Sequence, residues 1–142
     1  MKIRDNPMCP IFTYFVENCL NKKEVQFFTT NYEKIHRFFY DAKLKYPEIF
    51  KEMNFNTNGH FPFSKDIDED LFILKSAGLL VSISPQERLY LLSKRFPEKF
   101  PGSENNQSEL KTLANNFYNE LGCDEKGNIG KHTKFNGLEK IV

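Results

Sequence analysis

Apolar side chains recur every three to four residues in four long stretches of the chain, a spacing that places them on one face of a helix. The stretches predict helices at about 10–20, 31–46, 66–77 and 109–121, and Pro47 opens a shorter one at about 47–53. Residues suited to cap helices stand where three of them begin: Thr30, Asp66 and Ser108. The chain is therefore expected to be mainly helical, with about five helices.

The helix at about 66–77 has a clear buried stripe. Ile67, Leu71 and Leu74 share one face, and Phe72 and Ile73 are expected to widen that face. Gly78 follows, and glycine commonly ends a helix because it adopts the left-handed conformation without strain.

From Leu79 onward the helical period gives way to two short runs rich in branched apolar residues. The runs at 79–84 and 88–92 are joined by the polar turn Pro85-Gln86-Glu87, which predicts a small antiparallel β-hairpin. Residues 25–29 (VQFFT) form either a short strand or a segment that packs onto the next helix. The hairpin either closes the core or also contacts a ligand, and the sequence leaves both open.

Length and composition indicate one globular domain. With 142 residues and 15 phenylalanines, the chain can fill a core of useful size. We expect the domain to span 1–122 and a polar, glycine-containing tail to span 123–142. The high phenylalanine count also makes a buried homodimer interface plausible.

Charge and cysteine usage narrow the range of partners and compartments. Lysine and arginine number 20 against 19 acids, a net charge of +1, so there is no overall basic field that would attract nucleic acid or anionic lipid. The three cysteines, Cys9, Cys19 and Cys123, form no paired spacing. We therefore expect reduced thiols in a cytoplasmic protein, with Cys19 in the core.

The motifs that resemble metal or nucleotide sites are incomplete. Asp66-x-Asp68-x-Asp70 opens like a calcium loop, but Leu71 and Ala77 occupy the positions that need glycine and glutamate. The Gly127–Thr133 stretch lacks the spacing of a phosphate-binding loop. The three histidines are scattered, and His36 is expected to be a partly exposed structural residue. The sequence therefore predicts no metal and no cofactor.

Two stretches carry a resemblance to known families. The phrase Leu71-x-x-Leu74-x-x-x-Gly78-Leu79-Leu80, followed by Arg88-Leu89-Tyr90-Leu91-Leu92-Ser93, resembles the helix and wing of winged-helix domains. The Gly59-His60-Phe61-Pro62-Phe63-Ser64 stretch is similar to the step that opens the equivalent helix in Panacea-type antitoxin domains, although two residues separate its glycine and proline. The resemblance implies a winged-helix-like α+β fold in which the helix at 66–77 occupies the groove-reading position.

The charge of that helix disfavours DNA. From Ser64 to Leu80 there are two lysines and four acids, a net charge of −2, and carboxylates near the first turn would oppose duplex phosphates. We therefore predict a non-enzymatic module that binds a protein partner, in a regulatory or antitoxin-like role. The expected contact residues lie in the acidic turn and at the wing tip: Asp66, Asp68, Glu69, Asp70, Gln86 and Arg88.

Two other functions stay open. A DNA-binding transcription regulator would grip phosphates with basic residues on the second helix and after the wing: Lys34, Arg37, Lys94, Arg95 and Lys99. For the second helix, the alternative to phosphate binding is a solvent-exposed face on which Arg37 pairs with Asp41. The other function is a small enzyme with a pocket lined by tyrosine and histidine.

Overall fold

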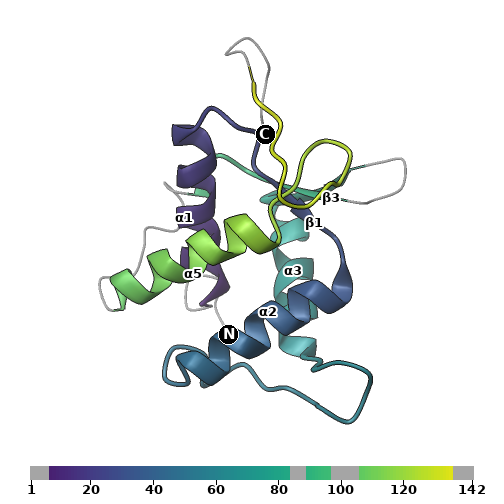
Figure 1. Cartoon of the computed structure of the whole chain (residues 1–142). Helices are drawn as coiled ribbons and strands as arrows, with labels where there is room; N and C mark the ends of the chain where they lie inside the picture. The colour runs from purple at the N-terminus through teal and green to yellow at the C-terminus, as the bar shows by residue number, and fades with distance from the viewer. Residues whose placement is uncertain (1–6, 84–88, 97–105, 136–142) are drawn as a thin grey trace.

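A computed structural model of the chain describes residues 7–83, 89–96 and 106–135. Within these ranges it is an α+β protein with helices packed around a small sheet (Figure 1). In chain order the elements are α1 (Met8–Asn21), β1 (Phe27–Thr29), α2 (Tyr32–Lys45), α3 (Lys65–Ser76), β2 (Leu80–Ile83), β3 (Leu89–Leu92) and α5 (Gln107–Glu120). The four long helices and the hairpin match the periodicity of the sequence, because each helix buries one apolar face.

The predicted short helix at 47–53 is wrong, so the described part of the chain has four helices and not five. Residues 47–52 form successive turns. The amide of Ile49 donates to the carbonyl of Tyr46 at 3.1 Å, and that of Met53 to Phe50 at 3.0 Å, bonds that span three residues instead of four. Phe50 and Met53 are nevertheless buried, which explains the misleading apolar pattern.

The hairpin belongs to a larger sheet than the sequence predicted. Strands β2 and β3 are antiparallel with Val81 opposite Leu91, and β1 adds to the other side of β3, giving the order β1-β3-β2. The VQFFT segment is therefore a strand in its second half. The outer edge of β1 is itself covered, because the amide of Thr29 donates to the carbonyl of Leu121 at 2.9 Å.

The helix caps differ from those predicted. Ser64, not Asp66, caps α3, and its hydroxyl accepts from the amide of Asp66 at 3.2 Å. Asn31, not Thr30, caps α2 by accepting from the amide of Lys34 at 3.0 Å. At α5 the cap position belongs to Asn106, two residues before Ser108. In α2 and α3 the hydroxyl or amide side chain lies immediately before the first helical residue, as the preference for short polar caps requires.

Eight phenylalanines in the described ranges are buried in one core. Phe12 on α1, Phe28 on β1 and Phe117 on α5 are fully buried, with Phe28 and Phe117 ring centroids 5.1 Å apart. Cys19 is also fully buried, which confirms its expected place in the core. These eight phenylalanine side chains pack within one copy of the chain, so their burial does not by itself require a dimer.

Residues 122–135, all but the first of them in the expected polar tail, pack against the start of the sheet. The amide of Val25 donates to the carbonyl of Thr133 at 2.8 Å, and that of Phe135 to Lys23 at 3.0 Å. Cys123 is fully buried. We call residues 122–135 the C-terminal strap. No helix in the described ranges combines the length and apolar character needed to cross a bilayer.

Candidate functional site

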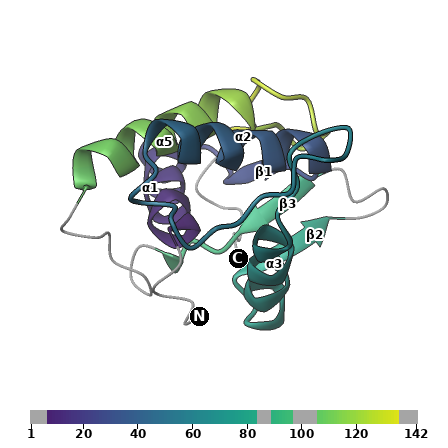
Figure 2. The same cartoon turned by 90° about the horizontal axis from the view of Figure 1, so that it is seen from below.

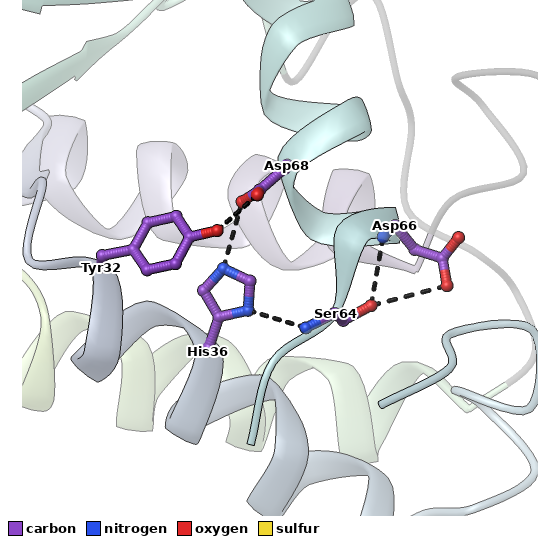
Figure 3. A network of polar contacts seen from close by, with 5 residues as sticks. All are labelled: Tyr32, His36, Ser64, Asp66 and Asp68. Carbon is purple, nitrogen blue, oxygen red and sulfur yellow. Dashed lines mark hydrogen bonds and ion pairs between the residues drawn. The ribbon is translucent and has the colours of Figure 1, made fainter. Parts of the chain in front are cut away.

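A polar network joins the start of α2 to the start of α3. Asp68, on α3, accepts a hydrogen bond from the hydroxyl of Tyr32 through one oxygen and contacts Nε2 of His36 at 3.1 Å through the other (Figure 3). On its far side, Nδ1 of His36 accepts from the backbone amide of Ser64 at 3.0 Å. The network therefore ties the residue that caps α3 to a ring on α2.

These contacts fix the protonation of the network. Because Nδ1 of His36 accepts a hydrogen bond, the ring proton lies on Nε2 and is donated to Asp68. Burial lowers the pKa of His36, against the opposing effect of Asp68, so the imidazole is neutral at pH 7. Burial and the hydrogen bond to Asp68 raise the pKa of Tyr32. With both rings neutral, the charge of the network is the single negative charge of Asp68.

His36 is fully buried, so its expected partial exposure is wrong. Its ring stacks on Phe63 with centroids 5.0 Å apart and lies 4.3 Å from Tyr32. The sequence did indicate that His36 is buried, since it lies between Ile35 and Phe39 on the buried stripe of α2. The segment at 61–64 covers the ring, and nothing in the local sequence indicated that segment's position.

Beside the network lies a groove of about 280 Å³. Its walls come from α2, α3 and β3, with Tyr32, Asp68, Leu71, Phe72, Lys75 and Tyr90 facing it. The Lys75 ammonium lies 5.0 Å from the centre of the Tyr90 ring. The groove thus has a carboxylate at one end of α3, an ammonium two turns later, and aromatic rings between them.

Two large apolar side chains of α3 are exposed. Phe72 is 69% exposed and Ile73 36% exposed, so the expectation that they widen the buried stripe is wrong. Only Ile67, Leu71 and Leu74 are buried, because α3 stands at the edge of the molecule beside β2 and β3 and away from α5 (Figure 2). Phe72 and Ile73 therefore add apolar surface to a helix whose other exposed side chains are polar.

The acids of the predicted contact surface point in different directions. Asp66 accepts from the backbone amide of Asn54 at 2.8 Å, and Asp68 belongs to the network. Asp70 is half-buried on the side of Cys9, whose pKa is raised to about 12 by burial and by this carboxylate. Glu69 is exposed. Gln86 and Arg88 lie outside the described residues.

The basic residues of the DNA alternative divide between two places. Arg37 on α2 pairs with Glu33 at 2.8 Å, and not with Asp41 as the sequence suggested. Lys34 and Arg37 share a shallow hollow with Asp41 and Glu120. Lys94 and Arg95 follow β3, where the amide of Arg95 donates to the hydroxyl of Ser93 at 3.2 Å. Lys99 lies outside the described residues.

A second polar cluster fastens the C-terminal strap. Glu24 is buried, and its carboxylate accepts from the Tyr118 hydroxyl and from Nζ of Lys134 at 3.0 Å. His132 stacks on Tyr118 with centroids 4.0 Å apart and planes 3° apart, and the ammonium of Lys22 lies 4.1 Å from the centre of the same ring. Among the described residues, the buried Nδ1 of His132 has no hydrogen-bond partner.

Charge states in this cluster depend on burial. Burial acts to raise the pKa of Glu24, but hydrogen bonds from Tyr118 and Lys134 outweigh it and lower the pKa. Burial lowers the pKa of His132. The sequence did not indicate this cluster, since its members come from the start of the sheet, α5 and the strap.

Comparison with known proteins gives no match: no family model, curated protein or solved structure is similar to the chain. In the described ranges, no group of three or more metal-ligating side chains converges.

Proposed function

We propose that the chain is a winged-helix-like, non-enzymatic module that acts by binding a protein through the exposed face of α3. The observation that carries the proposal is the exposure of Phe72 and Ile73 on this helix, at 69% and 36%. Aromatic side chains are enriched at protein interfaces, whereas an exposed phenylalanine beside carboxylates gains nothing from duplex phosphates. The role we favour is regulatory or antitoxin-like, in the cytoplasm.

The order of the elements supports the winged-helix-like assignment. Helix α3 is followed within four residues by the antiparallel hairpin β2–β3, and Gly78 has the positive φ of 75° expected where α3 ends. These are the features on which the resemblance rests. The end of α3 and the start of the hairpin lie where the spacing of Leu71, Leu74 and Gly78 predicted them.

The charges around α3 favour a protein over DNA. In the part of the chain that the structure describes, no lysine or arginine forms an ion pair with Asp66, Asp68 or Glu69. The N-terminal half of α3 therefore presents unneutralised negative charge, which duplex phosphates would repel. On α2, Arg37 is already paired with Glu33, which reduces its value as a phosphate contact.

The network beside the groove is poorly suited to acid–base catalysis. A general base needs a free lone pair within reach of substrate. Both nitrogens of His36 are occupied, one by the amide of Ser64 and the other by Asp68, and the side chain is only 1% exposed. The contacts indicate that this residue holds α2 and α3 together.

The proposal is tested by comparing Phe72→Glu with Leu44→Glu. Leu44, on α2, is 65% exposed, so both variants place a charge on an exposed apolar position. Each tagged variant would be expressed in cells that produce the chain naturally, and captured proteins would be quantified against wild type. We expect Phe72→Glu to lose a specific partner that Leu44→Glu retains, with thermal unfolding of both close to wild type. Equal capture by the two variants would refute the proposal.

A further inference from the structure

The exposed face of α3 has an order of charges that is complementary to itself. Phe72 lies at its centre, Glu69 is three residues before it, and Lys75 is three residues after it. These positions lie on adjoining turns of one side of the helix, since residues three and four apart are neighbours. Among the described residues, neither Glu69 nor Lys75 has an ion-pair partner within this chain.

We infer that the partner of this face is a second copy of the chain, with α3 packed antiparallel to α3 of that copy about a two-fold axis that passes near Phe72. In such an isologous contact, residue pairs are exchanged by the axis. Phe72 then meets its own copy, and Glu69 of each helix meets Lys75 of the other. The inference rests on the proposed function, because it names the protein that the face binds.

The antiparallel direction follows from the charges. A parallel pair centred on Phe72 would place Glu69 against Glu69 and Lys75 against Lys75, and like charges in contact disfavour association. The antiparallel pair replaces these two repulsive contacts with two attractive ones. Asp68, adjacent to Glu69 and half-exposed in the groove, adds negative charge where the second Lys75 arrives.

The fold leaves α3 accessible for this contact. The helix stands at the edge of the molecule (Figure 2), and only one of its faces packs on the described body. Antiparallel helices that cross at about 20° keep facing positions together over roughly two turns, the separation of Glu69 from Lys75. The apolar area offered by Phe72 and Ile73 is small, so the dimer is expected to be weak, micromolar or weaker.

Charge exchange tests the inference, using sedimentation velocity over concentrations up to about 1 mM. Glu69→Lys and Lys75→Glu each create like-charge contacts and are expected to weaken the dimer at least about tenfold. The double variant Glu69→Lys/Lys75→Glu restores opposite charges and is expected to recover most of the affinity. Glu48→Lys and Lys51→Glu make the same charge changes at exposed positions in the 47–52 turns and are expected to leave it unchanged.

Several results would overturn the inference. They are a wild-type chain that stays monomeric over the whole range, a double variant no better than the single ones, and a dimer unaffected by Phe72→Glu. Circular dichroism and thermal unfolding establish that each variant is folded. If the chain is monomeric but Phe72→Glu still abolishes capture of a different protein, the dimer is refuted and the proposed function stands. If Phe72→Glu changes neither the sedimentation of the chain nor the capture of other proteins, both the dimer and the proposed function are refuted.

Discussion

The backbone amide of Ser64 donates a hydrogen bond to Nδ1 of His36 at 3.0 Å, across 28 residues of sequence. This bond sets the tautomer of the imidazole, and the opposite nitrogen then faces Asp68 at 3.1 Å. Because Ser64 also caps α3 through its hydroxyl, the same residue begins the helix and anchors it to α2. The orientation of the exposed face of α3 therefore depends on a buried histidine.

Removing that histidine should destabilise the fold. His36→Ala leaves the amide of Ser64 and one oxygen of Asp68 without their partner and opens a cavity beside Phe63. We expect a loss of about 2–4 kcal/mol in the free energy of unfolding, measured by urea denaturation. His60→Ala is the matched control, since His60 is exposed, and should change stability by less than about 0.5 kcal/mol. Equal effects of the two would contradict the account of the network.

The acids of α3 should separate into structural and surface residues. Asp68→Lys removes the acceptor of both Tyr32 and His36 and should cost about 1–3 kcal/mol. The cost is expected at the lower end of that range, about 1–2 kcal/mol, because the Asp68 side chain is 38% exposed. Glu69→Lys should change stability by less than about 0.5 kcal/mol, since Glu69 is exposed. Thermal unfolding of both variants measures this, and a larger loss of stability for Glu69→Lys than for Asp68→Lys would contradict the prediction.

Stability should fall as the solution is acidified. The folded-state pKa of His36 and that of His132 are lowered from 6.5, so the unfolded chain binds these protons more readily and their contribution is lost as pH falls below 6.5. The folded-state pKa of Glu24 is lowered from 4.5, so its contribution is present above 4.5 and is lost as pH falls further.

Glu24→Gln separates these two effects. The variant should be less stable than wild type at pH 7, and the difference should narrow as pH falls below 4.5, the ordinary value of a glutamate. Above 4.5, the slope due to the histidines should persist in both proteins. Urea denaturation at a series of pH values measures this, and a constant difference across the acid range would show that Glu24 is not a charged acceptor for Tyr118 and Lys134.

Gly122 should not tolerate a side chain. A Cβ at this position would lie 2.5 Å from the carbonyl oxygen of Tyr118 and 2.7 Å from Cε1 of His132. The first of these is helix backbone and cannot move aside, so Gly122→Ala should cost about 1–3 kcal/mol. At Gly59 the nearest atom is 3.9 Å away, and Gly59→Ala should change stability by less than about 0.5 kcal/mol. Thermal unfolding of both variants measures this, and a loss of stability for Gly122→Ala no larger than that for Gly59→Ala would contradict the packing of the C-terminal strap.

The sequence predicted the helices and the hairpin, which depend on residues close together in the chain. The bounds of α1, α2, α3 and α5 lie within two residues of those predicted from periodicity, and the strands β2 and β3 follow from the change of period after Gly78. The 47–53 segment failed because Ile49, Phe50 and Met53 have helical spacing, but the segment closes through shorter, three-residue turns. The spacing of apolar residues does not distinguish a helix from three-residue turns when both structures bury the same side chains.

The polar clusters were not predictable in this way. The Glu24–Lys134 pair joins residues 110 positions apart, and Tyr118 reaches Glu24 across 94. Such contacts depend on how the whole chain folds, and a single sequence carries no local signal for them. The exposure of Phe72 was missed for a similar reason, since α3 shows helical periodicity but nothing in the pattern says how much of its circumference other elements cover.

Photo-crosslinking from position 72 tests the central claim most directly. Benzoylphenylalanine would replace Phe72 in one variant and Leu44 in another, in cells that produce the chain naturally. Crosslinked proteins would be identified by mass spectrometry. We predict a discrete adduct with another protein chain, a second copy included, from position 72 and none from position 44. Adducts of equal yield from both positions, or none from position 72, would contradict the claim that the exposed face of α3 binds protein.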